Sequence, residues 1–65
     1  MSNPTFVHFN YRGVTVTEKI IGNVSEFTWV HEVKPGKVFC SQGVCHTLLG
    51  VKRYISKHLK ALQAQ

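Results

Sequence analysis

The stretch EFTWVHEVKPGKVFCS, residues 26–41, decides the fold. Its first half alternates as a β-strand with one buried face does, and that face carries Phe27, Trp29, His31 and Val33. Pro35-Gly36 then predicts a turn, because proline fixes φ and glycine accepts a positive φ. We therefore expect antiparallel strands over about residues 26–33 and 37–41. The buried face is expected to be centred on Phe27, Trp29 and Val33.

The flanking segments complete the predicted fold. Residues 6–21 are rich in β-branched and aromatic side chains, and Arg12-Gly13 interrupts them, so they form either one bent strand or two. Near the C-terminus, apolar residues recur every three or four positions, at Leu48, Val51, Ile55, Leu59 and Leu62. This spacing predicts an amphipathic helix over about residues 47–62, with Thr47 as the N-cap and Ser41 as a second candidate. We expect one α+β domain over residues 1–65, a three-stranded or four-stranded antiparallel β-meander packed against this helix.

The size of the chain argues against an enzyme. A chain of 65 residues buries only about 60% of its unfolded surface and has little room for a deep cleft. We expect no catalytic residue and no cofactor. No apolar run is long enough to span a bilayer, and the N-terminus lacks the pattern of a signal peptide. These features predict a cytoplasmic protein that does not use a membrane, with reduced cysteines.

Positive charge is concentrated in the second half of the chain. The net charge is +5, yet the residues up to Val33 hold two bases and three acids, and those from Lys34 onward hold six bases and no acid. Such a field favours an anionic partner, although it also keeps a small protein soluble. The candidate binding residues are Arg12, Lys34, Lys37, Arg53, Lys57 and Lys60.

The segment VFCSQGVCHTLLG, residues 38–50, raises the question of a metal site. Cys40, Cys45 and His46 could hold zinc together with His31, but the C-x4-C spacing and the missing second pair are atypical of zinc sites. A redox pair or a disulfide between the cysteines is a further alternative. We favour a strand-to-helix junction in which Cys45 packs as a small apolar residue, and we predict no metal.

The order of these features resembles a known DNA-binding architecture. YRGV at residues 11–14 is followed by a strand with Trp29 and Glu32, a turn with Gly36-Lys37, Phe39, and Thr47 before the helix. Over about residues 9–62 this resembles DNA-binding domains of the ethylene-response-factor type. It is also similar to the amino-terminal arm-binding domains of phage integrases.

The resemblance implies that the sheet face turned away from the helix reads bases in the major groove. Arg12 would be the motif arginine, Glu32 and Lys34 would lie at polar contact positions, and Trp29 would pack toward the helix. The chain departs from this pattern because that face, with Thr28, Val30, Glu32 and Lys34, lacks an arginine cluster. Phosphate contacts from Arg53, Lys57 and Lys60 would dominate instead, with little sequence selectivity.

Two functions are therefore expected. The first is a small nucleic-acid-binding accessory protein of a phage or mobile element, with DNA favoured over RNA. The alternative is a protein–protein interaction module, such as a phage-type inhibitor of a host enzyme or defence complex. Its partner would be acidic or would itself bind nucleic acid, and exposed Val30 with Thr28 would form the contact patch. A homodimer is considered as well, since a second copy could cover apolar surface that one helix leaves bare.

Overall fold

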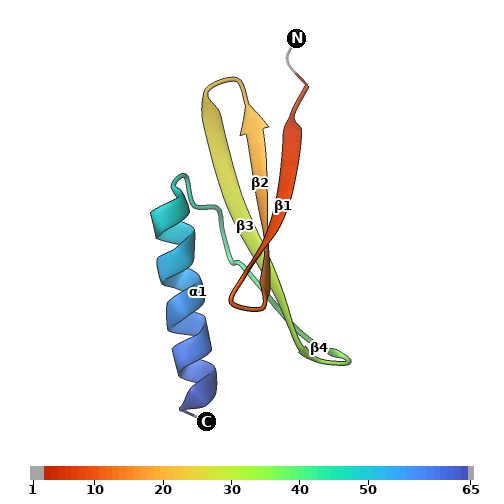
Figure 1. Ribbon diagram of the computed structural model, residues 1–65, viewed down its shortest axis with the longest axis vertical. Helices are drawn as coiled ribbons and strands as arrows, with labels where there is room; N and C mark the ends of the chain where they lie inside the picture. The colour runs from red at the N-terminus through yellow and green to blue at the C-terminus, as the bar shows by residue number, and fades with distance from the viewer. Residues whose placement is uncertain (1–2, 65) are drawn as a thin grey trace.

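The computed structural model describes residues 3–64 and has four strands and one helix. The strands are β1 (Thr5–Tyr11), β2 (Val14–Ile21), β3 (Val24–Lys34) and β4 (Lys37–Cys40), and the helix is α1 (Leu48–Gln63). The sheet is an antiparallel meander in the order β1-β2-β3-β4. Helix α1 runs along one side of this sheet (Figure 1). The predicted α+β meander with a C-terminal helix is confirmed, in its four-stranded form.

Residues 6–21 form two strands because the chain turns back at Arg12-Gly13. Both residues have positive φ, 53° and 88°, which is the backbone of a two-residue type I′ hairpin turn. The Oδ1 atom of Asn10 accepts a hydrogen bond of 2.9 Å from the Gly13 amide. The expected turn at Pro35-Gly36 is present as well, with a φ of 85° at Gly36.

The core lies between α1 and the two central strands. Val14, Val16, Phe27, Val51 and Ile55 are buried, and Trp29 is half-buried against them. The prediction for Val33 is wrong, because its side chain is 41% exposed. A register shift between Glu32 and Lys34 interrupts the alternation of β3 at this residue. An irregularity of this kind breaks the period of two on which the prediction rested.

The start of α1 is fixed by two local contacts. Thr47 is the N-cap, as predicted, and its Oγ1 accepts a hydrogen bond of 3.0 Å from the Gly50 amide. Just before it, Cys45 exchanges two backbone hydrogen bonds of 2.7 and 3.0 Å with Phe27 of β3. These contacts hold the β4–α1 connection against the sheet and direct the helix back across it. Among the described residues, no helix is both long and apolar enough to cross a membrane.

Candidate functional site

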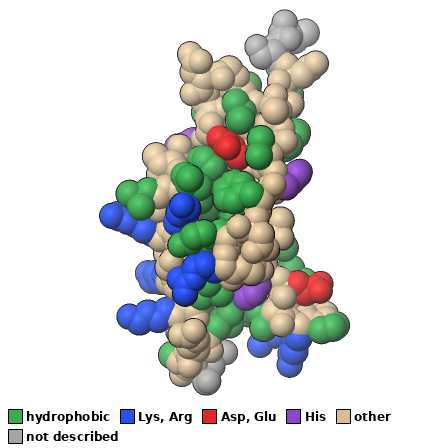
Figure 2. All heavy atoms as spheres, viewed as in Figure 1, with side chains coloured by type: hydrophobic (Ala, Val, Ile, Leu, Met, Phe, Trp, Pro, Cys, Tyr) green, Lys and Arg blue, Asp and Glu red, His purple; other side chains and the backbone are tan. Residues whose placement is uncertain are grey.

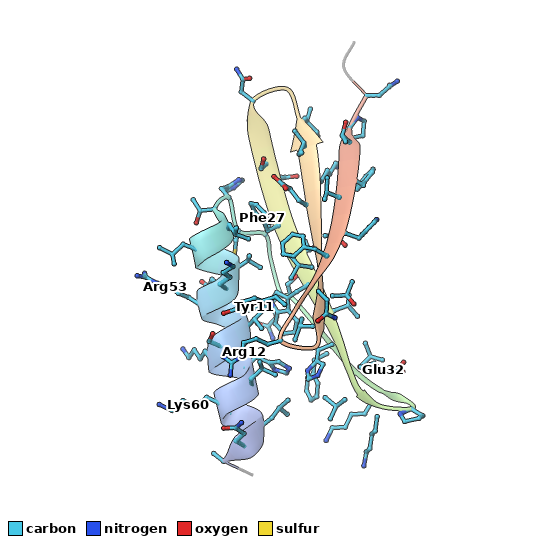
Figure 3. The ribbon with its side chains drawn as sticks, in the orientation of Figure 1. Tyr11, Arg12, Phe27, Glu32, Arg53 and Lys60 are labelled. Carbon is cyan, nitrogen blue, oxygen red and sulfur yellow. The ribbon has the colours of Figure 1, made fainter. Side chains whose placement is uncertain are left out.

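Half of the six predicted binding residues lie on the outer side of α1. Arg53, Lys57 and Lys60 are exposed and fall on the helix face opposite buried Val51 and Ile55. Arg53 and Lys60 point away from the sheet in Figure 3, and Lys and Arg side chains gather over the helix in Figure 2. No acidic residue occurs in α1, so the helix face with these cations carries positive charge only.

The β1–β2 turn adds Arg12 to the helix cations. Its Nη1 atom donates a hydrogen bond of 3.4 Å to Ser56 Oγ of α1, 44 residues away in sequence. Lys52 also lies on this side, with its Nζ 5.4 Å from the centre of the Tyr11 ring. We call Arg12, Lys52, Arg53, Lys57 and Lys60 the helix cation group (Figure 3).

Lys34 and Lys37 lie apart from this group. They face each other in the register at the end of the β3–β4 hairpin, beside the Pro35-Gly36 turn. This hairpin end projects away from α1 in Figure 1. The Nζ of Lys37 is 5.7 Å from the centre of the Phe39 ring. The structure therefore divides the six predicted binding residues into a helix set and a hairpin pair.

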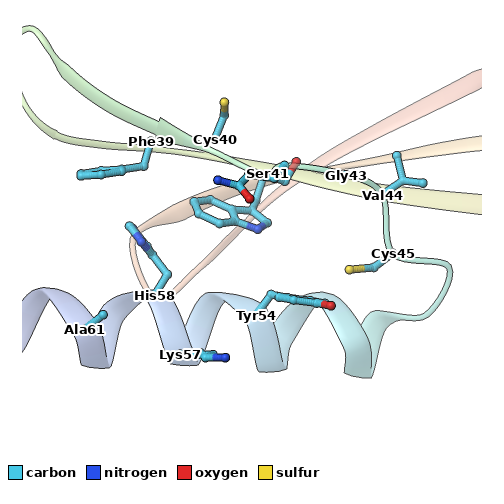
Figure 4. A pocket seen from close by; sticks show the side chains of 12 residues that line it. Phe39, Cys40, Ser41, Gly43, Val44, Cys45, Tyr54, Lys57, His58 and Ala61 are labelled. Carbon is cyan, nitrogen blue, oxygen red and sulfur yellow. The ribbon is translucent and has the colours of Figure 1, made fainter.

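A groove of about 550 Å³ runs between α1 and the β4–α1 connection (Figure 4). One wall is the connection from Cys40 to Cys45, and the other is the side of the helix with Tyr54, Lys57 and His58. In Figure 4 the side chains of Phe39, His58 and Tyr54 point toward the space between these walls. A smaller hollow of about 330 Å³ on the outside of the helix is lined by Gly50, Arg53, Tyr54 and Lys57. Tyr54 and Lys57 thus line both the groove and the smaller hollow.

Four rings form a cluster beside the groove, and three of them, Trp29, Phe39 and His58, line it. His58 lies at the centre of this cluster, with ring centroids 4.8 Å from Trp29, 5.1 Å from His31 and 5.1 Å from Phe39. Burial lowers the pKa of His58 below 6.5, and the nearby charge of His31 lowers this pKa further. His58 is therefore predominantly neutral at physiological pH.

The two cysteines do not form a shared site. Both are free thiols, with Cys40 exposed and Cys45 half-buried against the core. In Figure 4 the Cys40 sulfur points away from the helix, and Cys45 lies at the other end of the connection, near the start of α1. Within residues 3–64, no three His, Cys, Asp or Glu side chains are close enough to hold a metal ion. The segment is the junction between β4 and α1, and Cys45 packs there as predicted.

Two features of this region were not identified from the sequence as binding elements. Lys52 is not among the predicted binding residues, although it precedes Ser56 by four residues and therefore lies on the side of the helix that Arg12 reaches. The groove had no sequence signal, because its walls come from two segments whose distance depends on the Phe27–Cys45 bridge. Tyr54 could have been noticed, since it is an aromatic residue outside the apolar stripe.

Comparisons of this chain with known protein families, with curated proteins and with solved structures give no match. The resemblance to the ethylene-response-factor and integrase domains therefore stays a prediction from the sequence.

Proposed function

We propose that the protein is a nucleic-acid-binding accessory protein of the cytoplasm, of the kind that phages and mobile elements encode, and that its helix cation group contacts phosphates. The observation that carries this proposal is the contact between Arg12 and Ser56. It joins a cation from the β1–β2 turn to those of α1, so that charges from both halves of the chain lie on one surface. Clustered Lys and Arg on a single face are the electrostatic footprint of nucleic-acid binding.

This surface is suited to contact the phosphate backbone of a nucleic acid rather than to read its bases. Lys52 and Lys60 are separated by about 12 Å along the helix axis at 1.5 Å per residue. Their flexible ammonium groups bind phosphates as point charges. The open sheet face presents Thr28, Val30 and Glu32, which offer no bidentate partner for guanine. Binding is therefore expected to depend strongly on salt and weakly on sequence, with DNA as the first substrate to test.

The test is a titration of a labelled mixed-sequence DNA at two salt concentrations. If the helix cation group makes about five phosphate contacts, the affinity for duplex falls by on the order of 10²-fold between about 50 and 200 mM salt. Binding with no salt dependence, or none even at low salt, would contradict the proposal.

A pair of charge-matched variants locates the surface. Arg53→Glu with Lys57→Glu reverses charge on the helix, and Lys34→Glu with Lys37→Glu reverses it at the end of the β3–β4 hairpin. Each pair lowers the net charge from +5 to +1. We expect the helix pair to weaken binding at least about tenfold and the hairpin pair to weaken it only slightly. Equal losses would indicate a response to net charge alone.

A second candidate function is protein binding through the open sheet face. Val24, Val30 and Val38 on this face are all about half exposed, at 54%, 49% and 54%. Exposed apolar residues on a sheet face suit a protein partner. Under this alternative the protein inhibits a host enzyme or defence complex that is acidic or binds nucleic acid. Val30→Lys would then abolish capture of one stoichiometric partner in a pull-down, whereas the helix pair of charge reversals would leave that partner bound.

A further inference from the structure

Tyr54 stands between the groove and the cations of the outer helix face. Its side chain is 62% exposed, although it is a large aromatic ring on the only helix of the described residues. It lines the groove on one side and the smaller hollow with Arg53 on the other, and Lys57 does the same. The groove therefore opens directly onto two members of the helix cation group.

The lining of the groove suits a flat, uncharged ring. Trp29, Phe39 and His58 supply aromatic surface, and Ser41 and Gln42 supply polar atoms on the connection. The volume of about 550 Å³ is within the range of small-molecule sites. Because the rim carries Lys57 and the neighbouring Arg53, a ring attached to an anionic backbone matches both the lining and the charge.

We propose that this groove takes a base of a single-stranded nucleic acid, with Tyr54 as the stacking surface and Lys57 and Arg53 on the flanking phosphates. The inference rests on the proposed function and names its substrate class. Proteins that bind single strands combine a cationic track with aromatic side chains on which bases stack. The base of a duplex is held in its stack and cannot enter a groove without being flipped out. The groove therefore gives the single strand an advantage over the duplex.

The experiment compares a single-stranded mixed-sequence DNA with its duplex in binding to three proteins, the wild type, Tyr54→Ala and Tyr54→Phe. Stacking is worth about 1–3 kcal/mol per base, so we expect Tyr54→Ala to lose about tenfold or more in affinity for the single strand. Tyr54→Phe retains the ring and should stay within about twofold of the wild type. The affinity of all three proteins for the duplex should be alike. Because Tyr54 is exposed, its replacement should leave the core intact, and circular dichroism of the variants checks this.

Trp29 provides a second readout inside the groove. It is the only tryptophan of the chain, so its fluorescence reports on this site alone. We expect the single strand to quench this fluorescence at saturation and the duplex to leave it unchanged.

The possible failures are distinguishable. No binding of either DNA at low salt would overturn the proposed function and this inference together. Equal binding of both DNAs, with Tyr54→Ala like the wild type, would overturn the inference and leave the phosphate-binding function standing. Single-strand binding without any change in Trp29 fluorescence would also overturn it, because the base would then lie outside the groove.

Discussion

The Nδ1 atom of His31 lies 2.9 Å from the Nε2 atom of His58, and this contact joins β3 to α1. The two rings meet at 90°, edge to face. One nitrogen must donate a proton and the other must accept it, so the contact needs at least one neutral ring. When both rings are protonated, two donors face each other and the contact is lost. This pair therefore makes the docking of the helix sensitive to acid.

We expect the free energy of unfolding to fall as the pH drops below about 6.5. The pKa of His58 is lowered by burial and then by the charge of His31, while Lys37 stands next to Phe39 on the same cluster. Between the lowered pKa and 6.5, the unfolded chain binds more protons at this residue than the folded chain. Stability is thus full above 6.5, declines as the pH falls toward the folded pKa, and levels off below it.

The measurement is the thermal midpoint of wild type and His58→Gln at pH values above and below this range. His58→Gln removes this titration, so the midpoint of the variant should fall less on acidification than that of the wild type, whatever the variant costs in stability at high pH. His8→Gln is the control, since His8 is an exposed histidine on β1. An acid-induced fall as large in His58→Gln as in the wild type would show that another group causes it.

The N-cap of α1 predicts an unusual response at Gly50. Alanine favours a helix over glycine by about 1 kcal/mol, but a Cβ at Gly50 would lie 2.9 Å from Thr47 Oγ1. That oxygen accepts a hydrogen bond of 3.0 Å from the Gly50 amide. We expect Gly50→Ala to leave the free energy of unfolding within about 0.5 kcal/mol of the wild type, because displacing a cap worth about 1 kcal/mol offsets the gain in helix propensity.

The matched background is Thr47→Ala, which removes the oxygen. There Gly50→Ala should raise the free energy of unfolding by about 0.5–1 kcal/mol, since only the helix propensity remains. Urea unfolding of the four proteins of this cycle checks both expectations, a change near zero with Thr47 and a gain without it. A stabilising effect of the same size in both backgrounds would mean that the cap accommodates the methyl group.

Arg12 allows charge to be removed from the helix cation group without loss of stability. Its φ of 53° is a left-handed conformation, which asparagine adopts more readily than arginine. Arg12→Asn should therefore keep or slightly raise the thermal midpoint. It should weaken DNA binding a few-fold and reduce the slope of log affinity against log salt by about 1. Lys34→Asn removes the same charge at the hairpin end and should leave the slope unchanged.

The sequence predicted the fold where local signals agree with tertiary packing. The alternation around Trp29, the Pro35-Gly36 turn and the Thr47 cap are local, and each was identified correctly. Val33 was not, because the register shift beside it depends on how β3 and β4 pair. Whether Arg12-Gly13 bends a strand or reverses it depends on both residues taking positive φ, which is uncommon for arginine.

The candidate site was predictable only in part, for a similar reason. The spacing of Arg53, Lys57 and Lys60 places them on one helix face without any tertiary information. The arrival of Arg12 at Ser56 and the separation of the hairpin lysines depend on how the helix crosses the sheet. That crossing follows from the bridge between Phe27 and Cys45, for which the sequence has no marker.

The outer edge of β1 is where the expected homodimer would form. Thr5–Tyr11 is a strand without any charged residue, in a chain of net charge +5, so two copies can approach there with little repulsion. Tyr11 and Val14 flank the two-residue turn and form a hydrogen-bonded pair. From there toward the start of β1, non-hydrogen-bonded and hydrogen-bonded pairs alternate. The backbone groups of Phe6, His8 and Asn10 therefore face outward.

A two-fold axis at His8 would pair these outward groups with those of a second copy, Phe6 opposite Asn10 and His8 opposite itself. His8→Pro removes one outward amide and no amide of the β1–β2 ladder, so the variant should fold and yet stay monomeric. His8→Ala is the control, because it loses the same 2.9 Å side-chain contact with Thr17 but keeps the amide. Sedimentation equilibrium should find dimers for wild type and His8→Ala and monomers for His8→Pro. A dimer in all three would place the contact elsewhere, and a monomeric wild type would contradict the homodimer itself.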